Sequence, residues 1–170
     1  MLLDVTIRPE RPEDHDTIGH IIRTAFHGMP YAAGDEAELV DALRSQRALS
    51  VSLVAESQDT VIGQIALSPA QPADGTPGWY ALGPVSVVPA HQQSGVGAQL
   101  VRAGLQAIAA LDARGCILTG NPAYYVRFGF ELSPANVPDG EPAEFFMVKL
   151  LGEHCPVGPI AFHPAFYGDK

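Results

Sequence analysis

The hydrophobic positions of the chain change their period along its length, and each change marks a predicted strand or helix. Residues 5–8 alternate as a half-buried strand does, and apolar residues at helical spacing then predict a helix after Pro12 and a second helix over residues 35–44. Pro12 suits a first helical turn, and the acidic residues behind it favour the positive end of the helix dipole. The segment His27–Pro30 ends the first helix.

Two runs typical of β-strands, residues 50–56 and 61–67, are separated by four polar residues and predict a β-hairpin. A loop rich in proline and glycine follows over residues 69–78. Residues 79–88 form the next predicted strand. Pro84 inside it predicts either an edge strand or a bulge, because proline cannot donate to the ladder.

The second half of the chain continues this alternation, beginning with a long helix predicted over residues 94–112. The elements predicted after it are a buried strand at 115–119, a short helix at 121–128, strands at 130–132 and 145–150, and an irregular tail from Gly152. Asn121 is a suitable N-cap for the short helix, and Pro122 a suitable first helical residue. The order β-α-α-β-β-β-α-β-α-β-β predicts a mixed α/β (α+β) fold, with a mostly antiparallel central sheet and helices on both faces.

Length and composition place this fold in one globular domain. The 170 residues are enough for a full core, and 46% hydrophobic against 17% charged residues is a globular composition. We expect the main domain over residues 1–151 and a C-terminal extension over residues 152–170 that packs on the same domain.

The charge balance excludes one class of partner. Ten Lys and Arg residues against 19 Asp and Glu residues give a net charge of −9. A nucleic-acid binder normally presents a basic face, so no nucleic-acid partner is expected. An acidic surface suits a cationic acceptor, or it simply confers solubility.

Neither a disulfide, a metal nor a membrane partner is expected. Cys116 and Cys155 are too far apart for a local metal motif, and we interpret them as two reduced thiols in a cytoplasmic protein, with Cys116 in the core. Met1–Asp4 lacks the pattern of a signal peptide. Residues 75–101 carry no charged side chain, but their prolines and glycines exclude a membrane helix.

The segment 83–97 carries most of the chemical information. It reads as an apolar strand, a turn and a glycine-punctuated loop that opens a helix, so that backbone N–H groups and the helix dipole point at one spot. Such a spot binds phosphate without a basic side chain, and the strand would add free backbone donors, which predicts a nucleotide-like ligand with its reactive end along the strand. Gly95 and Gly97 would also suit an ordinary strand-to-helix turn. A dinucleotide fingerprint would need glycine where Leu100 stands.

These residues resemble the GNAT superfamily of N-acetyltransferases. Gln92–Gly97 fits the family's cofactor loop, Arg/Gln-x-x-Gly-x-Gly/Ala, and the strand before it ends in the familiar Val-x-Pro form at Val87–Pro89. Downstream, Tyr125–Phe130 matches the family signature Tyr-x-x-x-Gly-Phe. Asn121–Phe130 and His163–Phe166 are similar to an acetyltransferase branch with Asn/Asp-Pro-x-Tyr-Tyr-x-x-Phe-Gly-Phe and a C-terminal His-Pro-Ala-Phe.

The resemblance implies a GNAT-like fold and transfer of an acetyl group from acetyl-CoA, without a metal, directly to a primary amine of a small molecule or protein. The amides of residues 93–98 would hold the pyrophosphate, and a bulge near residues 84–87 would let the pantetheine pair with free backbone. The Val87 N–H would polarise the thioester oxygen. The residues that the resemblance assigns to the cofactor are Val85, Val87, Gln92, Gln93, Ser94, Gly95, Val96, Gly97, Ala98, Asn121 and Tyr125.

The loop departs from the family pattern in two ways. Gln92 replaces the more usual Arg, and Gln93-Ser94 replaces Gly-Lys or Gly-Arg. Phosphate affinity would then rest on backbone amides, with Arg102 or Arg127 as helpers, and we expect weaker cofactor binding.

Tyr125 is the expected acid, which would protonate the departing thiolate as its family counterpart is thought to do. Its unperturbed pKa of about 10 lies above the value of about 8.5 for a thiol. The aromatic residues around Tyr125 are also consistent with a core position, and Tyr124 is then the alternative acid. Asn121 suits either a helix cap or a cofactor contact.

Glu56 is the expected general base, acting directly or through water. His91 near the loop also suits a surface position, and the acidic residues at 35–41 suit either an amine-attracting or a solvated face. His163 and Phe166 would close the acceptor pocket or only pin the tail. Neither cysteine falls beside the cofactor motifs, which favours direct transfer over an acyl-enzyme.

Alternatives to acetyl transfer remain open at this point. The same fold would also suit a non-catalytic module that binds or senses acyl-CoA, or an enzyme that uses succinyl- or propionyl-CoA. The loops at residues 28–34 and 70–78 carry no code for the acceptor. The protein would be a monomer or a homodimer.

Overall fold

The computed structural model describes residues 4–29 and 34–168. The expectations for Met1–Leu3 and for Pro30 lie outside the described residues. In the part of the chain that is described, no helix is both long enough and apolar enough to cross a membrane.

The chain divides into two compact units that share two strands and one helix. The first unit holds the residues up to Leu67 together with Gly83–Leu105. The second holds Ser68–Leu82 together with the residues from Gln106 onward.

Seven strands are hydrogen-bonded in the order β1-β2-β3-β5-β6-β8-β7. They are β1 (Thr6–Pro9), β2 (Val51–Ser57), β3 (Thr60–Pro69), β5 (Trp79–Val87), β6 (Gly115–Thr119), β7 (Glu131–Leu132) and β8 (Phe146–Leu150). The pair β5–β6 is parallel, and the pairs β1–β2, β2–β3, β6–β8 and β7–β8 are antiparallel. The prediction of a mixed, mostly antiparallel sheet is therefore confirmed. β5 lies between β3 and β6, but in the described residues its pairing with β6 covers only Trp79–Ala81, so at Pro84 the strand is an edge on that side.

In the first unit, β2 and β3 form the predicted hairpin. Its two turn residues, Gln58 and Asp59, have positive φ angles of 51° and 63°. This is the geometry of a type I′ turn, whose twist matches that of the flanking strands. The register shifts between Ala55 and Glu56, which places an irregularity in β2 beside the predicted base.

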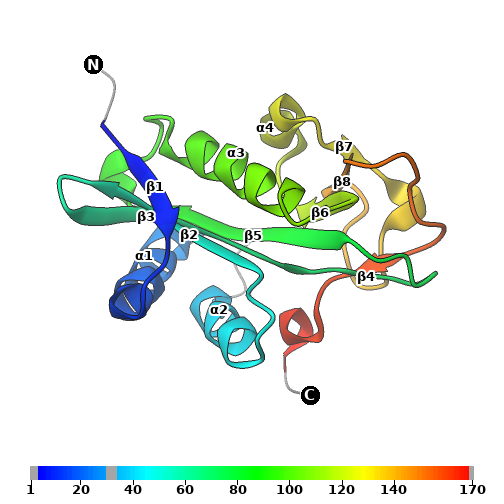
Figure 1. Cartoon of the computed structure of the whole chain (residues 1–170), viewed down its shortest axis with the longest axis horizontal. Helices are drawn as coiled ribbons and strands as arrows, with labels where there is room; N and C mark the ends of the chain where they lie inside the picture. The colour runs from blue at the N-terminus through cyan, green and yellow to red at the C-terminus, as the bar shows by residue number, and fades with distance from the viewer. Residues whose placement is uncertain (1–3, 30–33, 169–170) are drawn as a thin grey trace. The chain divides into compact units, whose positions relative to one another are not determined.

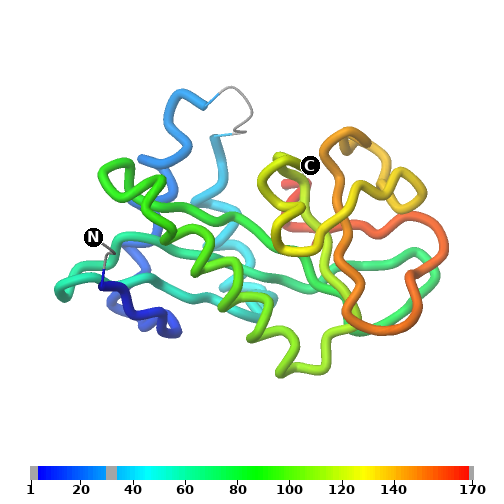
Figure 2. The backbone as a smooth tube through the Cα atoms, turned by 90° about the horizontal axis from the view of Figure 1, so that it is seen from above, coloured from blue at the N-terminus to red at the C-terminus, as the bar shows by residue number. Residues whose placement is uncertain are grey.

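Helices cover both faces of the strands of the first unit. α1 (His15–Phe26) and α2 (Glu36–Ser45) lie on one face (Figure 1), and α3 (Val96–Ala109) crosses the other, as Figure 2 shows from above. The apolar stripes of α1 and α2 are buried in one cluster, formed by Ile18, Ile22, Ala37, Val40, Val54 and Ala66. On the other face Gly63 lets α3 approach β3, because a Cβ there would lie 3.0 Å from the side chain of Leu100.

α3 is shorter than the helix predicted over residues 94–112. It begins at Val96, after Gly95, and it ends at Ala109. Asp112 then takes a left-handed φ of 62°, and the Ala113 N–H bonds back to the Ile108 carbonyl. A residue of this conformation closes a helix, so the apolar pattern overran the end of the helix by three residues.

The second unit is built on β6, β8 and β7 with one short helix. α4 (Pro122–Tyr125) continues as a 3₁₀ turn over Val126–Phe128, and together they confirm the short helix predicted at 121–128. The core of the second unit is an apolar cluster of Trp79, Ala81, Ile117, Phe146, Val148, Ile160 and Phe162.

The predicted loop at 69–78 and the predicted irregular tail pair with each other. β4 (Gln71–Pro72) and β9 (Ile160–Ala161) form a separate two-stranded antiparallel sheet. The prediction of irregular structure is wrong at these residues. The reason is burial of the tail residues Ile160 and Phe162 in the core of the second unit, a contact that neither segment signals locally.

β5 carries the predicted bulge. The Val88 N–H donates to the Ile62 carbonyl, and the Ala70 N–H donates to the Trp79 carbonyl, both at 2.9 Å. These pairs span residues 79 to 88 on β5 but only residues 62 to 70 on β3, so β5 has one residue more than its partner. Gly83 lies in this stretch with a φ of 135°, a conformation that favours glycine.

Candidate active site

The last residues of β5 present backbone donors that the sheet does not use. Val88 faces β3, because its N–H bonds to Ile62, and successive residues of an antiparallel strand alternate in direction. The N–H groups of Val85 and Val87 therefore point away from β3. In the described residues the pairing of β5 with β6 covers Trp79–Ala81 and stops before both valines. These two donors lie outside both ladders.

The loop after β5 adds further donors at the start of α3. Gln93 has a φ of 64° and Gly95 a φ of 87°, so the chain turns sharply before the helix. The Gly95 carbonyl accepts the first helical bond, from the Gln99 N–H at 3.1 Å. The N–H groups of Val96–Ala98 have no acceptor within the helix, and the positive end of its dipole lies among them. This is the geometry that binds a phosphate group.

The polar side chains of this loop bind the loop itself. Gln92 Nε2 donates to the Val87 carbonyl at 2.9 Å, and Ser94 Oγ donates to the His91 carbonyl. The loop side chains therefore shape the turn, and the backbone amides remain for a ligand. His91 is half-buried, and among the described residues its Nδ1 has no hydrogen-bond partner.

In the second unit, Asn121 and Pro122 begin α4 as predicted. Asn121 Oδ1 accepts a hydrogen bond from the Ala123 N–H at 3.0 Å. Its carbonyl accepts the N–H groups of Tyr124 and Tyr125, at 3.0 and 3.1 Å. Of the two roles predicted for Asn121, the structure shows the helix cap, and contact with a cofactor stays a prediction.

Tyr125 packs among aromatic rings. Its ring lies edge-on to Tyr124, with a centroid distance of 5.0 Å, and to Phe130, at 6.1 Å. Gly120 leaves room for this ring, because a Cβ there would lie 2.6 Å from Tyr125 Cε2. Burial, with a smaller contribution from Tyr124, raises the pKa of Tyr125 to about 12. The hydroxyl therefore keeps its proton throughout the physiological range.

This raised pKa narrows the role expected of Tyr125. A protonated hydroxyl donates a hydrogen bond to a developing thiolate at any physiological pH. Complete transfer of the proton to a free thiolate, whose conjugate acid has a pKa of about 8.5, would be uphill by about 5 kcal/mol. The unperturbed pKa of a tyrosine, about 10, already lies above that of a thiol, about 8.5, so proton transfer from tyrosine to thiolate is uphill there as well. Both comparisons favour Tyr125 as a hydrogen-bond donor over complete proton transfer.

Glu56 is held by Arg8. Arg8 Nε donates to Glu56 Oε2 at 3.0 Å, and Nη2 lies 2.8 Å from the same oxygen. The same guanidinium donates from Nη1 to the nearly buried Asp14 at 2.8 Å, and this hydrogen bond lowers the pKa of Asp14. β2 lies two strands from β5, about 10 Å at the usual spacing. This geometry does not support direct proton removal by Glu56 and leaves the route through water as the prediction.

The tail residues are fixed within the second unit. His163 Nδ1 accepts the Ala165 N–H at 3.0 Å and so caps the last 3₁₀ turn. Phe166 packs on Phe162 with a centroid distance of 4.9 Å. These contacts support the reading in which both residues pin the tail.

Cys116 and Cys155 are free thiols, as predicted, and Cys116 is buried. Burial raises the pKa of both thiols above its usual range. A thiol that keeps its proton is a poor nucleophile, so neither cysteine is activated. Across residues 4–29 and 34–168, no group of three or more His, Cys, Asp or Glu side chains could hold a metal ion.

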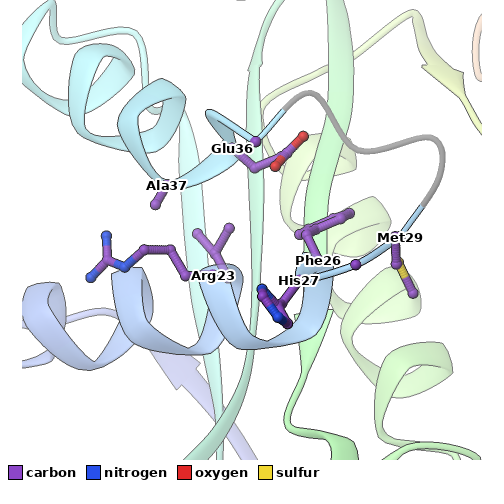
Figure 3. Close-up of a pocket in the computed structure, with 9 residues that line it drawn as sticks. Arg23, Phe26, His27, Met29, Glu36 and Ala37 are labelled. Carbon is purple, nitrogen blue, oxygen red and sulfur yellow. The ribbon is translucent and has the colours of Figure 1, made fainter.

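A pocket of about 290 Å³ lies between the end of α1 and the start of α2 (Figure 3). Figure 3 shows Phe26 of α1 and Glu36 of α2 on facing sides of it. The pocket combines apolar and charged side chains, namely Ile22, Phe26, Met29, Ala37, Arg23, His27 and Glu36. The predicted loop at residues 28–34 contributes Gly28, Met29 and Gly34, and residues 30–33 lie outside the described part.

Two polar residues of the first unit that contact the candidate site were not identified from the sequence. Arg8 binds the predicted base, and Gln64 is fully buried in β3 beside the bulge of β5. The available signal was a polar residue inside a predicted strand, in the run 61–67 for Gln64.

Comparison with known proteins agrees with this geometry. A family model described as the acetyltransferase (GNAT) domain matches residues 48–132, which is half of the chain. The N-acetyltransferase YhbS of Escherichia coli strain K12 is 34% identical over 128 residues, which cover 75% of this chain and 74% of YhbS.

Two solved structures are similar over nearly the whole chain. A GNAT family acetyltransferase from Brucella melitensis, solved in complex with acetyl-CoA, is 42% identical, with a TM-score of 0.86 over 96% of this chain and 98% of that chain. Escherichia coli YhbS in complex with CoA is 29% identical, with a TM-score of 0.87 over 100% of this chain and 96% of YhbS. The chain belongs to the GNAT family of N-acetyltransferases.

Proposed function

We propose that this enzyme transfers the acetyl group of acetyl-CoA directly to a primary amine of a small molecule or protein. The observation that carries the proposal is the set of unused backbone donors in the first unit, which begins at Val85 and ends at the start of α3. The Brucella relative was solved with acetyl-CoA and YhbS with CoA, and both align with almost all of this chain.

The donors divide the cofactor into two parts. The amides of residues 93–98, at the positive end of α3, bind the pyrophosphate. The backbone of Val85 and Val87 pairs with the pantetheine as a further strand would, and the Val87 N–H polarises the thioester oxygen. We retain Asn121 and Tyr125 as cofactor contacts within this proposal.

In the proposed reaction, the neutral amine nitrogen attacks the thioester carbonyl carbon. The C–N bond forms, the C–S bond breaks, and the Val87 N–H stabilises the negative charge on the oxygen. Tyr125 donates a hydrogen bond to the departing sulfur, which leaves as a thiolate and then takes a proton from water. The proton of the amine leaves to water next to Glu56. No acyl-enzyme is included, because both thiols hold their protons.

The pocket between α1 and α2 is our candidate for the acceptor site. Its apolar residues, such as Phe26, suit the body of an amine, and Arg23 and Glu36 supply charges of both signs at its wall. This combination suits an acceptor that carries an apolar group beside polar groups.

The proposal is tested by titrating the protein calorimetrically with acetyl-CoA, with Gly97→Glu as the control. The new carboxylate at the start of α3 would repel phosphate, so we expect one-site binding that the variant loses. Release of the CoA thiol is then measured with a polyamine, a lysine peptide and a peptide with a free N-terminus. Binding without thiol release from any of them would support the non-catalytic module. Absence of binding would contradict the proposal.

A further inference from the structure

Gln64 is a fully buried polar side chain in the interior of β3, beside the bulge of β5. Its Nε2 donates to the Pro84 carbonyl at 3.2 Å and to Ser86 Oγ at 3.0 Å. The Pro84 carbonyl can only accept, so this contact determines which end of the amide faces β5. One side chain therefore holds β5 on both sides of Val85.

The backbone around Pro84 explains why β5 needs this contact. Pro84 has no N–H to donate, and β5 carries one residue more than β3 in this stretch. Gly83, directly before it, has a φ of 135°. The register of the two strands changes by one residue in this stretch, and the Gln64 amide binds the Pro84 carbonyl within it.

Gln64 also shows that stability alone does not account for an amide at this position. Its Oε1 is buried and, among the residues described, has no hydrogen-bond partner. Buried polar atoms without a partner are uncommon in folded proteins. An apolar side chain of the same shape would leave no such oxygen. The contacts of the amide are therefore made by its donor, Nε2, and both of them are with β5.

We propose that Gln64 is a positioning residue for the thioester. It holds residues 84–86, and so aims the Val87 N–H at the acetyl carbonyl and the Val85 N–H at the pantetheine. The inference rests on the proposed function, because it assumes acetyl-CoA on β5. Gln64 acts through the strand and does not itself touch the ligand.

The test uses acetyl-CoA labelled with carbon-13 at the thioester carbonyl and needs no acceptor. A hydrogen bond to the carbonyl moves its resonance downfield, so binding to the wild type is expected to shift it. Gln64→Met removes both donors at similar volume and should lose most of this shift. The preference for acetyl-CoA over CoA should fall at least about threefold, whereas the affinity for CoA stays within about twofold, because the loop holds the phosphates.

Leu43→Ala is the control for a general loss of stability, because Leu43 is fully buried and lies on α2, outside both β3 and β5. It should keep the shift. If Gln64→Met does not fold, Gln64→Asn replaces it with the same expectation, because it is one methylene too short to reach both partners. An unchanged shift in either variant, or a wild type that binds without a shift, would overturn the inference. A wild type that does not bind acetyl-CoA would overturn the proposed function instead.

Discussion

The side chain of Gln92 donates from Nε2 to the Val87 carbonyl at 2.9 Å, and so ties the loop at residues 92–97 to the end of β5. Gln92 stands where the family more often has arginine. In this chain the Gln92 side chain holds the loop against the end of β5. It binds the carbonyl of Val87, the residue whose N–H is left free by the sheet. The loop is shaped by its own side chains, and in the proposed function the charge that it offers to a phosphate comes from backbone dipoles.

Gln92→Ala should weaken the binding of acetyl-CoA about fivefold, because one hydrogen bond that orders the loop is worth about 1 kcal/mol. Calorimetric titration measures this change. Gln106→Ala, an exposed position later on α3, is the matched control and should bind as the wild type does. Equal affinity of the Gln92 variant and the control would mean that the loop keeps its shape without this bond.

Gly95→Ala should reduce both stability and cofactor affinity. Gly95 has a φ of 87°, and a Cβ there would meet no atom within 4 Å, so the effect comes from the backbone alone and costs about 1 kcal/mol. Gly140→Ala is matched to it, with a φ of 88° and equally open space. Both variants should lower the free energy of unfolding in urea by similar amounts. Only Gly95→Ala should also weaken acetyl-CoA binding, and equal binding by the two would contradict a ligand at this loop.

Tyr125→Phe should lower the rate of acetyl transfer about 10-fold or more while leaving acetyl-CoA affinity almost intact, because the hydrogen bond to sulfur develops only as the C–S bond breaks. Steady-state rates at pH 7 to 9 and a calorimetric titration separate the two effects. Tyr124→Phe is the parallel variant. A larger loss of rate in that variant than in Tyr125→Phe would transfer the role to Tyr124.

Tyr125 should also make the protein sensitive to alkali. Its pKa is raised to about 12 from a usual value of 10, so the folded state holds the proton more tightly than the unfolded state. This contribution is fully present below about pH 10 and is lost as pH rises toward 12, at up to about 1.4 kcal/mol per pH unit. Urea unfolding between pH 9 and 11 should show a flatter decline in Tyr125→Phe than in the wild type.

Glu56→Gln tests the proposed base against a neighbour that shares its partner. Glu56 and Asp14 both bind Arg8, so Asp14→Asn disturbs the same guanidinium without removing the proposed base. We expect Glu56→Gln to lower the rate about 10-fold or more near neutral pH and Asp14→Asn to lower mainly stability. If the two variants lose the same small amount of rate, Glu56 serves only to hold Arg8 and β1.

The predictions that held depend on short-range chemistry. The cap of α4 joins Asn121 to Ala123, two residues away, and the hairpin turn lies at Gln58 and Asp59. The bulge in β5 could be predicted because a proline has no N–H to donate in any structural context. The failed prediction of irregular structure involves distant partners, because β4 and β9 pair across about 90 residues of chain. The predicted end of α3 failed locally, at the left-handed Asp112.

The sequence by itself determined the order of strands and helices, the loop that opens α3 and the motifs of the family, because periodicity, caps and glycine positions act over a few residues. The tertiary structure decided what each polar side chain binds: Arg8 for Glu56, the Val87 carbonyl for Gln92, and the Pro84 carbonyl for Gln64. Those partners follow from strand register, loop conformation and burial. Register and burial bring together residues that are far apart in the chain, as Arg8 and Glu56 are.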